Sequence, residues 1–148
     1  MQVRNAITKD ITSIVSFQLQ MAAETEGIEL HEPTVKKGVT AVINDDKKGQ
    51  YYVTEINDKI VASLLTTYEW SDWRNGTILW IQSVYVLEEY RRKGVYRNMY
   101  SHIKQLVLEN ENLNGIRLYA DKSNLSAHKT YLQLGMSPDH YITFEWLK

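Results

Sequence analysis

Apolar residues along this chain follow two different spacings. Positions three and four apart, as in Ile11, Ile14, Val15 and Leu19, predict amphipathic helices, whereas alternating apolar and polar positions predict strands. The predicted helices are 8–26, a segment that begins after Pro33, 94–109 and 125–134. The predicted strands are 3–7, 51–56, 59–68, 77–86, 116–121 and 141–147.

Turn and cap residues set the predicted boundaries. Thr8 is a suitable cap for the first helix, and Gly27 ends it. Asn57 and Asp58 predict a tight turn between two strands. Residues 70–76 are predicted to be a loop that carries two tryptophans and ends at the turn signal Asn75-Gly76.

The order of elements indicates the fold class. It runs strand, two helices, three strands, helix, strand, helix, strand, with hairpins in the middle and one crossover helix. This order predicts an α/β (α+β) fold with a mixed, mostly antiparallel central sheet of about six to seven strands, flanked by four helices. A length of 148 residues without a visible linker predicts a single domain, 1–148.

Composition narrows the classes of function. The formal net charge is -1, which gives no general attraction to nucleic acid or to an anionic membrane. The chain has no cysteine, which excludes disulfides and a cysteine nucleophile, and its histidines lack the spacing of metal ligands. No signal peptide or membrane span is visible, so a cytoplasmic location is expected.

A basic turn stands between the apolar segment 79–86 and the helix predicted from 94. It contains Arg91, Arg92, Lys93 and Gly94. Amides at such a turn and in the first turn of a helix converge on one point, where the helix dipole favours an anion. The basic side chains add positive charge at the same place. The turn therefore predicts a ligand that carries phosphates, although a solvated charged loop would look similar.

Two motifs in this order resemble the GNAT superfamily of N-acetyltransferases. The family pattern Q/R-x-x-G-x-G/A resembles the segment from Arg91 to Tyr96. A second pattern resembles Asn124, Tyr131 and Gly135, with Ala127 between them. Tyr96 departs from the first pattern, because the family has a small residue there, and a side chain pointing away from the phosphates would accommodate it.

The resemblance implies a GNAT-like fold, acetyl-CoA as cosubstrate and specific roles for residues. Tyr131 would be the acid that protonates the departing thiolate, although it could also be a core aromatic of its helix. The strand edge near Val84 would pair with the two amides of the pantetheine arm. The residues implied to bind the cofactor are Val84, Tyr85, Val86, Arg91, Arg92, Lys93, Gly94, Val95, Tyr96, Asn124 and Ala127.

The general base and the amine acceptor site remain open in the sequence. Some similar enzymes place a glutamate on the fourth strand, where this chain has Gln82, which takes no proton at neutral pH. A water relayed by Gln82 is one alternative; the others are Glu24, Glu26, Glu29, Glu32 and His31. The acceptor pocket is expected between the first two helices and the loop with Trp70, Trp73, Glu69 and Asp72, although either tryptophan could instead be a packing or oligomer contact. The predicted substrate-binding residues are Glu29, Trp70, Trp73 and Gln82.

These features predict an acetyl-CoA-dependent N-acetyltransferase. It would act on a primary amine of a small molecule, or on a protein amine, by direct attack in a ternary complex. The alternative is an acyl-CoA-binding sensor or interaction module without turnover, and a weaker third reading is a nucleic-acid module. No metal, nucleic acid or membrane partner is expected, and exposed Trp and Tyr side chains would support a homodimer.

Overall fold

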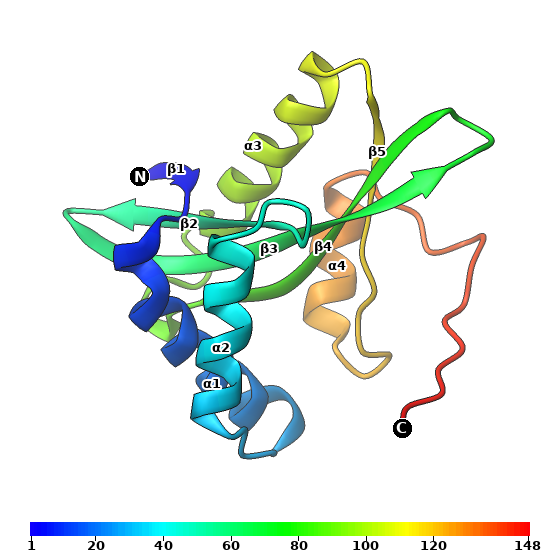
Figure 1. Cartoon of the computed structure of the whole chain (residues 1–148). Coiled ribbons are helices and arrows are strands. Elements are labelled where there is room, and N and C mark those ends of the chain that lie inside the picture. The colour runs from blue at the N-terminus through cyan, green and yellow to red at the C-terminus, as the bar shows by residue number, and fades with distance from the viewer. The chain divides into compact units, whose positions relative to one another are not determined.

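The computed structural model describes residues 1–148, which form two compact units, Met1–Arg117 and Leu118–Lys148. The first unit contains one sheet in the strand order β1-β2-β3-β4-β5 (Figure 1). All neighbouring strands are antiparallel except β4 and β5, which are parallel. The predicted mixed, mostly antiparallel sheet is confirmed, with five strands in place of six to seven. The strands are β1 Gln2–Asn5, β2 Gln50–Ile56, β3 Lys59–Ser71, β4 Gly76–Val86 and β5 Leu113–Arg117.

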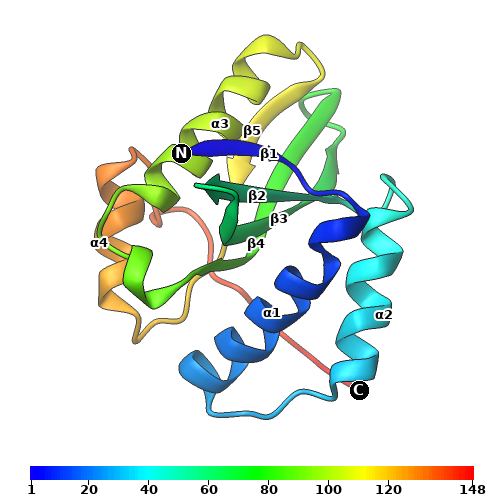
Figure 2. The ribbon, with the colours of Figure 1, turned by 90° about the vertical axis from the view of Figure 1, so that its left-hand side faces the viewer.

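Three helices cover the two faces of this sheet. Helices α1, Ile11–Glu26, and α2, Glu32–Ile43, lie on one face, and α3, Val95–Glu109, lies on the other (Figures 1 and 2). The alternation along β2 explains this arrangement, because successive side chains point to opposite faces. Tyr51 joins the core beneath α1 and α2, whereas the Tyr52 ring meets His102 of α3.

The helix ends follow local chemistry. Gly27 takes the left-handed conformation with φ +66° and ends α1, as predicted. Pro33 lies in the first turn of α2, a position that suits proline, and the helix begins at Glu32 instead of after Pro33. Thr8, predicted to be the cap of α1, instead opens a short 3-10 turn, Thr8–Asp10. The Asp10 carboxylate accepts a hydrogen bond from the Ile7 N–H at 2.9 Å, so Asp10 holds this turn.

The two hairpins differ in how well the sequence predicts them. Asn57 and Asp58 both have positive φ, +49° and +62°, which is the geometry of the predicted tight turn between β2 and β3. The predicted loop 70–76 is wrong at both ends, because β3 continues to Ser71 and β4 begins at Gly76. Trp70 pairs with Thr77 and Ser71 pairs with Gly76 across the sheet, which leaves only residues 72–75 for the turn.

Two predicted strands are corrected by the structure. The strand predicted at 116–121 lies earlier, at Leu113–Arg117, where it runs parallel to the first residues of β4. Residues 141–147 form no strand, although their apolar and polar residues alternate. Alternation describes the side chains that a strand would present, whereas a ladder also requires a partner strand.

The second unit contains one helix. Helix α4, Leu125–Gln133, has nearly the predicted bounds, and Gly135 follows it with φ +84°. The side-chain oxygen of Asn124 accepts a hydrogen bond from the Ala127 N–H at 3.0 Å, so Asn124 caps this helix.

Candidate functional site

Strand β4 contains an extra residue near its end. Ser63 and Leu65 of β3 are two residues apart, but their partners Tyr85 and Gln82 are three apart. This mismatch is a β-bulge, and Ser83 within it has φ +51°, which is rare for a residue other than glycine. As a result, Gln82 and Tyr85 lie on the same face of the sheet, the face that carries α1.

One edge of β4 loses its neighbour before the bulge. The pairing of β4 with β5 ends at Trp80 and Arg117. From Ile81 to Val86, β4 therefore pairs with β3 alone and presents main-chain groups along its other edge. A ligand with amide groups can bind such an edge as another strand would. This is the segment where the sequence places Val84, Tyr85 and Val86.

The basic turn leads directly from this strand into α3. Arg92 and Gly94 have positive φ, +60° and +79°. The first intrahelical hydrogen bond of α3 runs from the Asn98 N–H to the Gly94 carbonyl. Amides that precede this bond point beyond the helix end, toward a place suited to an anion. Arg92 and Lys93 are exposed beside it, so the local structure fits the phosphate site predicted from the sequence.

Arg91 lies differently from its two basic neighbours. Its Nε donates to the Val86 carbonyl at 2.9 Å, and its Nη2 donates to Oε2 of Glu24 on α1 at 2.5 Å. The guanidinium also lies over the Tyr85 ring, 5.3 Å from the ring centroid. Arg91 therefore joins the end of β4 to the first helix.

Tyr85 is the centre of this cluster. Its ring stacks on Phe17 of α1, and its hydroxyl lies 2.6 Å from Glu24 Oε1 and 3.1 Å from Gln20 Oε1. Burial, together with the adjacent Glu24 carboxylate, raises the pKa of Tyr85 to about 12. The hydrogen bond from Tyr85 and the Arg91 guanidinium hold the pKa of Glu24 below its usual value. Glu24 is therefore ionised at neutral pH and a weak base.

A second polar group lies farther back along β3 and β4. Glu69 accepts hydrogen bonds from the Trp80 indole and from Arg117, and these contacts lower its pKa. The Gln82 amide donates to the Thr67 hydroxyl at 2.6 Å. No motif or local pattern in the sequence points to Thr67, Gln20 or Arg117. Only the alternation of β3, which places Thr67 and Glu69 on one face, was available to indicate a shared surface.

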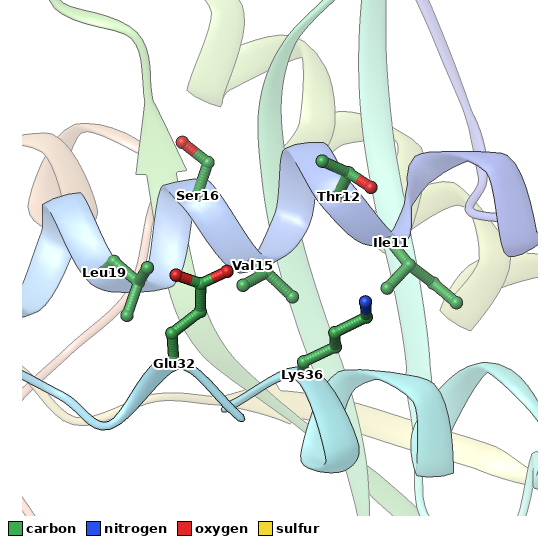
Figure 3. Close-up of a pocket in the computed structure, with 7 residues that line it drawn as sticks. All are labelled: Ile11, Thr12, Val15, Ser16, Leu19, Glu32 and Lys36. Carbon is green, nitrogen blue, oxygen red and sulfur yellow. The ribbon is translucent and has the colours of Figure 1, made fainter. Parts of the chain in front are cut away.

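A hollow between α1 and α2 is not lined by the residues predicted to bind the acceptor. This hollow has a volume of about 250 Å³, and Glu32 and Lys36 of α2 face α1 across it (Figure 3). Its lining comprises Ile11, Thr12, Val15, Ser16, Leu19, Glu32 and Lys36, and it includes none of the predicted substrate residues. Trp70 and Trp73 are 64% and 89% exposed, and Glu29 is an exposed residue between the two helices. Their assignment to the acceptor stays a prediction.

The residues of the second motif share helix α4. Asn124 and Ala127 are joined by the capping hydrogen bond, and Tyr131 follows one turn later and is half-buried. Their predicted roles in cofactor binding and proton transfer stay predictions. No group of three His, Cys, Asp or Glu residues in the structure could hold a metal ion. None of its helices has the length and apolar character needed to cross a membrane.

A comparison with known protein families shows the family of this chain. A model of the acetyltransferase (GNAT) family matches residues 15–136. The chain belongs to the GNAT acetyltransferase family. The region matched in this GNAT protein includes the β4 edge, the basic turn and the α4 motif, and the family uses acetyl-CoA. The resemblance drawn from the two motifs is thereby confirmed.

Solved structures agree with this assignment. A possible acetyltransferase from Clostridium difficile 630 is 45% identical, with a TM-score of 0.93 over 99% of this chain and 97% of that one. A predicted acetyltransferase with acetyl-CoA from Clostridium acetobutylicum is 20% identical, with a TM-score of 0.75 over 97% and 95%. An aminoglycoside acetyltransferase from an uncultured soil metagenomic sample, in complex with sisomicin, is 15% identical, with a TM-score of 0.77 over 99% and 95%. These last two show the shared fold. The curated proteins searched contain no match to this chain.

Proposed function

We propose that this GNAT protein transfers the acetyl group of acetyl-CoA to a primary amine, with a small molecule as the acceptor. The observation that carries the proposal is the continuous path from the β4 edge to the start of α3. After Trp80, one edge of β4 has no partner strand. The chain then continues from the end of β4 into the basic turn and the N-terminus of α3. The pantetheine amides suit the first part of this path, and the diphosphate suits the second.

The transfer proceeds by direct attack in a ternary complex. The amine nitrogen forms a bond to the thioester carbon, and the carbon–sulfur bond breaks. The chain has no cysteine to carry a covalent acyl group, which favours this route over a two-step one. A main-chain N–H of the β4 bulge segment near Val84 would stabilise the oxyanion, as a donor in a fixed position.

Tyr131 supplies the proton that the thiolate needs. Its support is its place in the second motif and the chemistry of a phenol, which is protonated at neutral pH and able to donate. Glu24 is engaged by Tyr85 and Arg91, and Gln82 cannot accept a proton, so neither takes the proton that the amine loses. The remaining candidates for this step are a water relayed by Gln82, and the side chains of Glu26, Glu29, Glu32 and His31.

The test is a measurement of free thiol released from acetyl-CoA in the presence of a panel of amines. Release that depends on one of the amines supports the proposal. Calorimetric binding of acetyl-CoA without release for any amine would favour the sensor or interaction module. Failure to bind any coenzyme A derivative at millimolar concentration would rule out both functions.

A further inference from the structure

The carboxylate of Glu24 is shared between two groups at the end of β4. Its Oε1 accepts the Tyr85 hydroxyl hydrogen bond at 2.6 Å, and its Oε2 accepts from Arg91 Nη2 at 2.5 Å. Tyr85 belongs to the strand segment with the open edge, and Arg91 opens the basic turn. Glu24 of α1 thus binds the chain at Tyr85, just before the end of β4, and at Arg91, just after it.

The guanidinium of Arg91 is engaged by two partners, one on β4 and one on α1. The Val86 carbonyl and the Glu24 carboxylate bind two different nitrogens of the guanidinium, which fixes its plane, and Glu24 also compensates its charge. Arg92 and Lys93 make no ion pair. The cations available to a diphosphate are therefore these two, whereas Arg91 acts as a structural link.

The bulge segment requires such a link. Ser83 is held at φ +51°, a conformation that costs free energy and persists only where neighbouring contacts impose it. Beyond Trp80 the strand has hydrogen-bonded neighbours on one side only. Tyr85, anchored by its ring on Phe17 and by its hydroxyl on Glu24, fixes the strand two residues after Ser83.

We infer that Glu24 is a positioning residue, which through Tyr85 and Arg91 sets the main chain of residues 83–86 that receives the pantetheine arm. The same geometry makes Arg91 part of this link and leaves the diphosphate to Arg92, Lys93 and the amides of α3. The inference rests on the proposed function, and it narrows the sequence prediction that assigned all three basic residues to the cofactor.

The experiment compares two ligands by calorimetry. One is acetyl-CoA, and the other is its nucleotide half, adenosine 3′-phosphate 5′-diphosphate, which lacks the pantetheine arm. Glu24→Gln should weaken acetyl-CoA binding about tenfold, the order expected for a lost charged hydrogen bond. It should leave binding of the nucleotide half unchanged or slightly tighter, because the substitution releases Arg91 from its ion pair and alters no group of the basic turn or of α3. Arg92→Gln should weaken the binding of both ligands. Glu111→Gln, at an exposed residue that forms no ion pair, is the charge-matched control.

A second measurement reports on the link without any ligand. Burial and Glu24 raise the pKa of Tyr85 to about 12, so the Glu24→Gln variant should show a lower pKa for this phenol by NMR. Amide hydrogen exchange in residues 83–86 should also become faster. Tyr85→Phe should accelerate the same amides, because it removes the hydroxyl and keeps the ring.

Each outcome has a distinct meaning. If Glu24→Gln reduced the affinity for acetyl-CoA and for the nucleotide half equally, the inference would be overturned, because Arg91 would then act on the diphosphate. Unchanged binding of both ligands with unchanged exchange would also overturn it. If the wild-type protein bound neither ligand, the proposed function would fail, and the exchange measurement would still decide whether Glu24 positions the strand.

Discussion

The guanidinium of Arg4 donates to both carboxylate oxygens of Asp10, at 2.7 and 3.0 Å. Arg4 also donates to Glu55 on β2 at 2.9 Å, and Asp10 is only 2% exposed. The pair joins β1, β2 and the turn that precedes α1. Burial opposes ionisation of Asp10, but the hydrogen bonds from Arg4 and from the Ile7 N–H outweigh it and lower the pKa of this carboxyl.

Because folding lowers the pKa of Asp10, the free energy of unfolding should fall as the solution becomes acidic. A carboxyl whose pKa is lowered by folding stabilises the protein above its unfolded pKa of about 3.9, and this contribution is lost as the pH falls through the folded value. Asp10→Asn should therefore cost about 2–3 kcal/mol at neutral pH and progressively less below about pH 4. Urea unfolding at a series of pH values measures this. Asp46→Asn is the exposed control, and a cost for Asp10→Asn that stayed constant with pH would contradict the assignment.

Two glycines should respond in opposite ways to alanine. A Cβ on Gly49 would lie 2.4 Å from the Thr66 carbonyl oxygen, and its φ is +145°. Gly38 lies inside α2, and a Cβ there meets nothing within 4 Å. Gly49→Ala should destabilise by about 2–3 kcal/mol, whereas Gly38→Ala should stabilise by about 0.5–1 kcal/mol. Denaturant midpoints at an unchanged m-value provide the comparison. Midpoint shifts of the same sign in both variants would contradict the difference in space around the two glycines.

The bulge at Ser83 should tolerate glycine and resist a β-branched residue. Glycine adopts positive φ without a steric cost, whereas valine at φ +51° does not. Ser83→Gly should leave acetyl-CoA affinity within about twofold, and Ser83→Val should reduce stability by about 1–2 kcal/mol and weaken binding. Calorimetry and thermal unfolding of both variants test this. Equal effects of the two substitutions would mean that the serine hydroxyl, not the backbone conformation, is what matters.

Tyr131 should affect turnover more than binding. Tyr131→Phe keeps the ring and removes the proton donor, so kcat should fall by about 10–100-fold while the Kd of acetyl-CoA stays unchanged. Steady-state kinetics and calorimetry on the same preparation separate the two effects. Tyr119→Phe provides a control outside the two motifs. A full kcat in Tyr131→Phe would remove Tyr131 from the mechanism.

Local signals were sufficient for much of the fold. Helical spacing, Gly27, Pro33 and the Asn57-Asp58 turn each act within a few residues, and the structure follows them. Strand predictions were weaker where the partner decides the outcome. The strand at 116–121 was shifted because residues 113–117 pair with the start of β4, and alternation at 141–147 carried no information about a partner.

The candidate site also has a part that local sequence indicates and a part that it does not. The basic turn before α3 is contiguous, so its residue types were visible in the sequence. The link between Glu24, Tyr85 and Arg91 joins residues more than sixty positions apart, and no local pattern indicates it. The bulge at Ser83 was also invisible, because an extra residue appears only when β4 is aligned with β3.

Strand β4 has an unpaired side from Ile81 to Val86, and this affects how the purified protein should be stored. An unsatisfied row of peptide groups recruits any extended segment it encounters, including one from a neighbouring molecule. Bound coenzyme A would occupy these peptide groups and so prevent a segment of another molecule from pairing with them. Samples stored with excess coenzyme A should consequently stay dispersed longer than samples stored alone, a difference that light scattering would record.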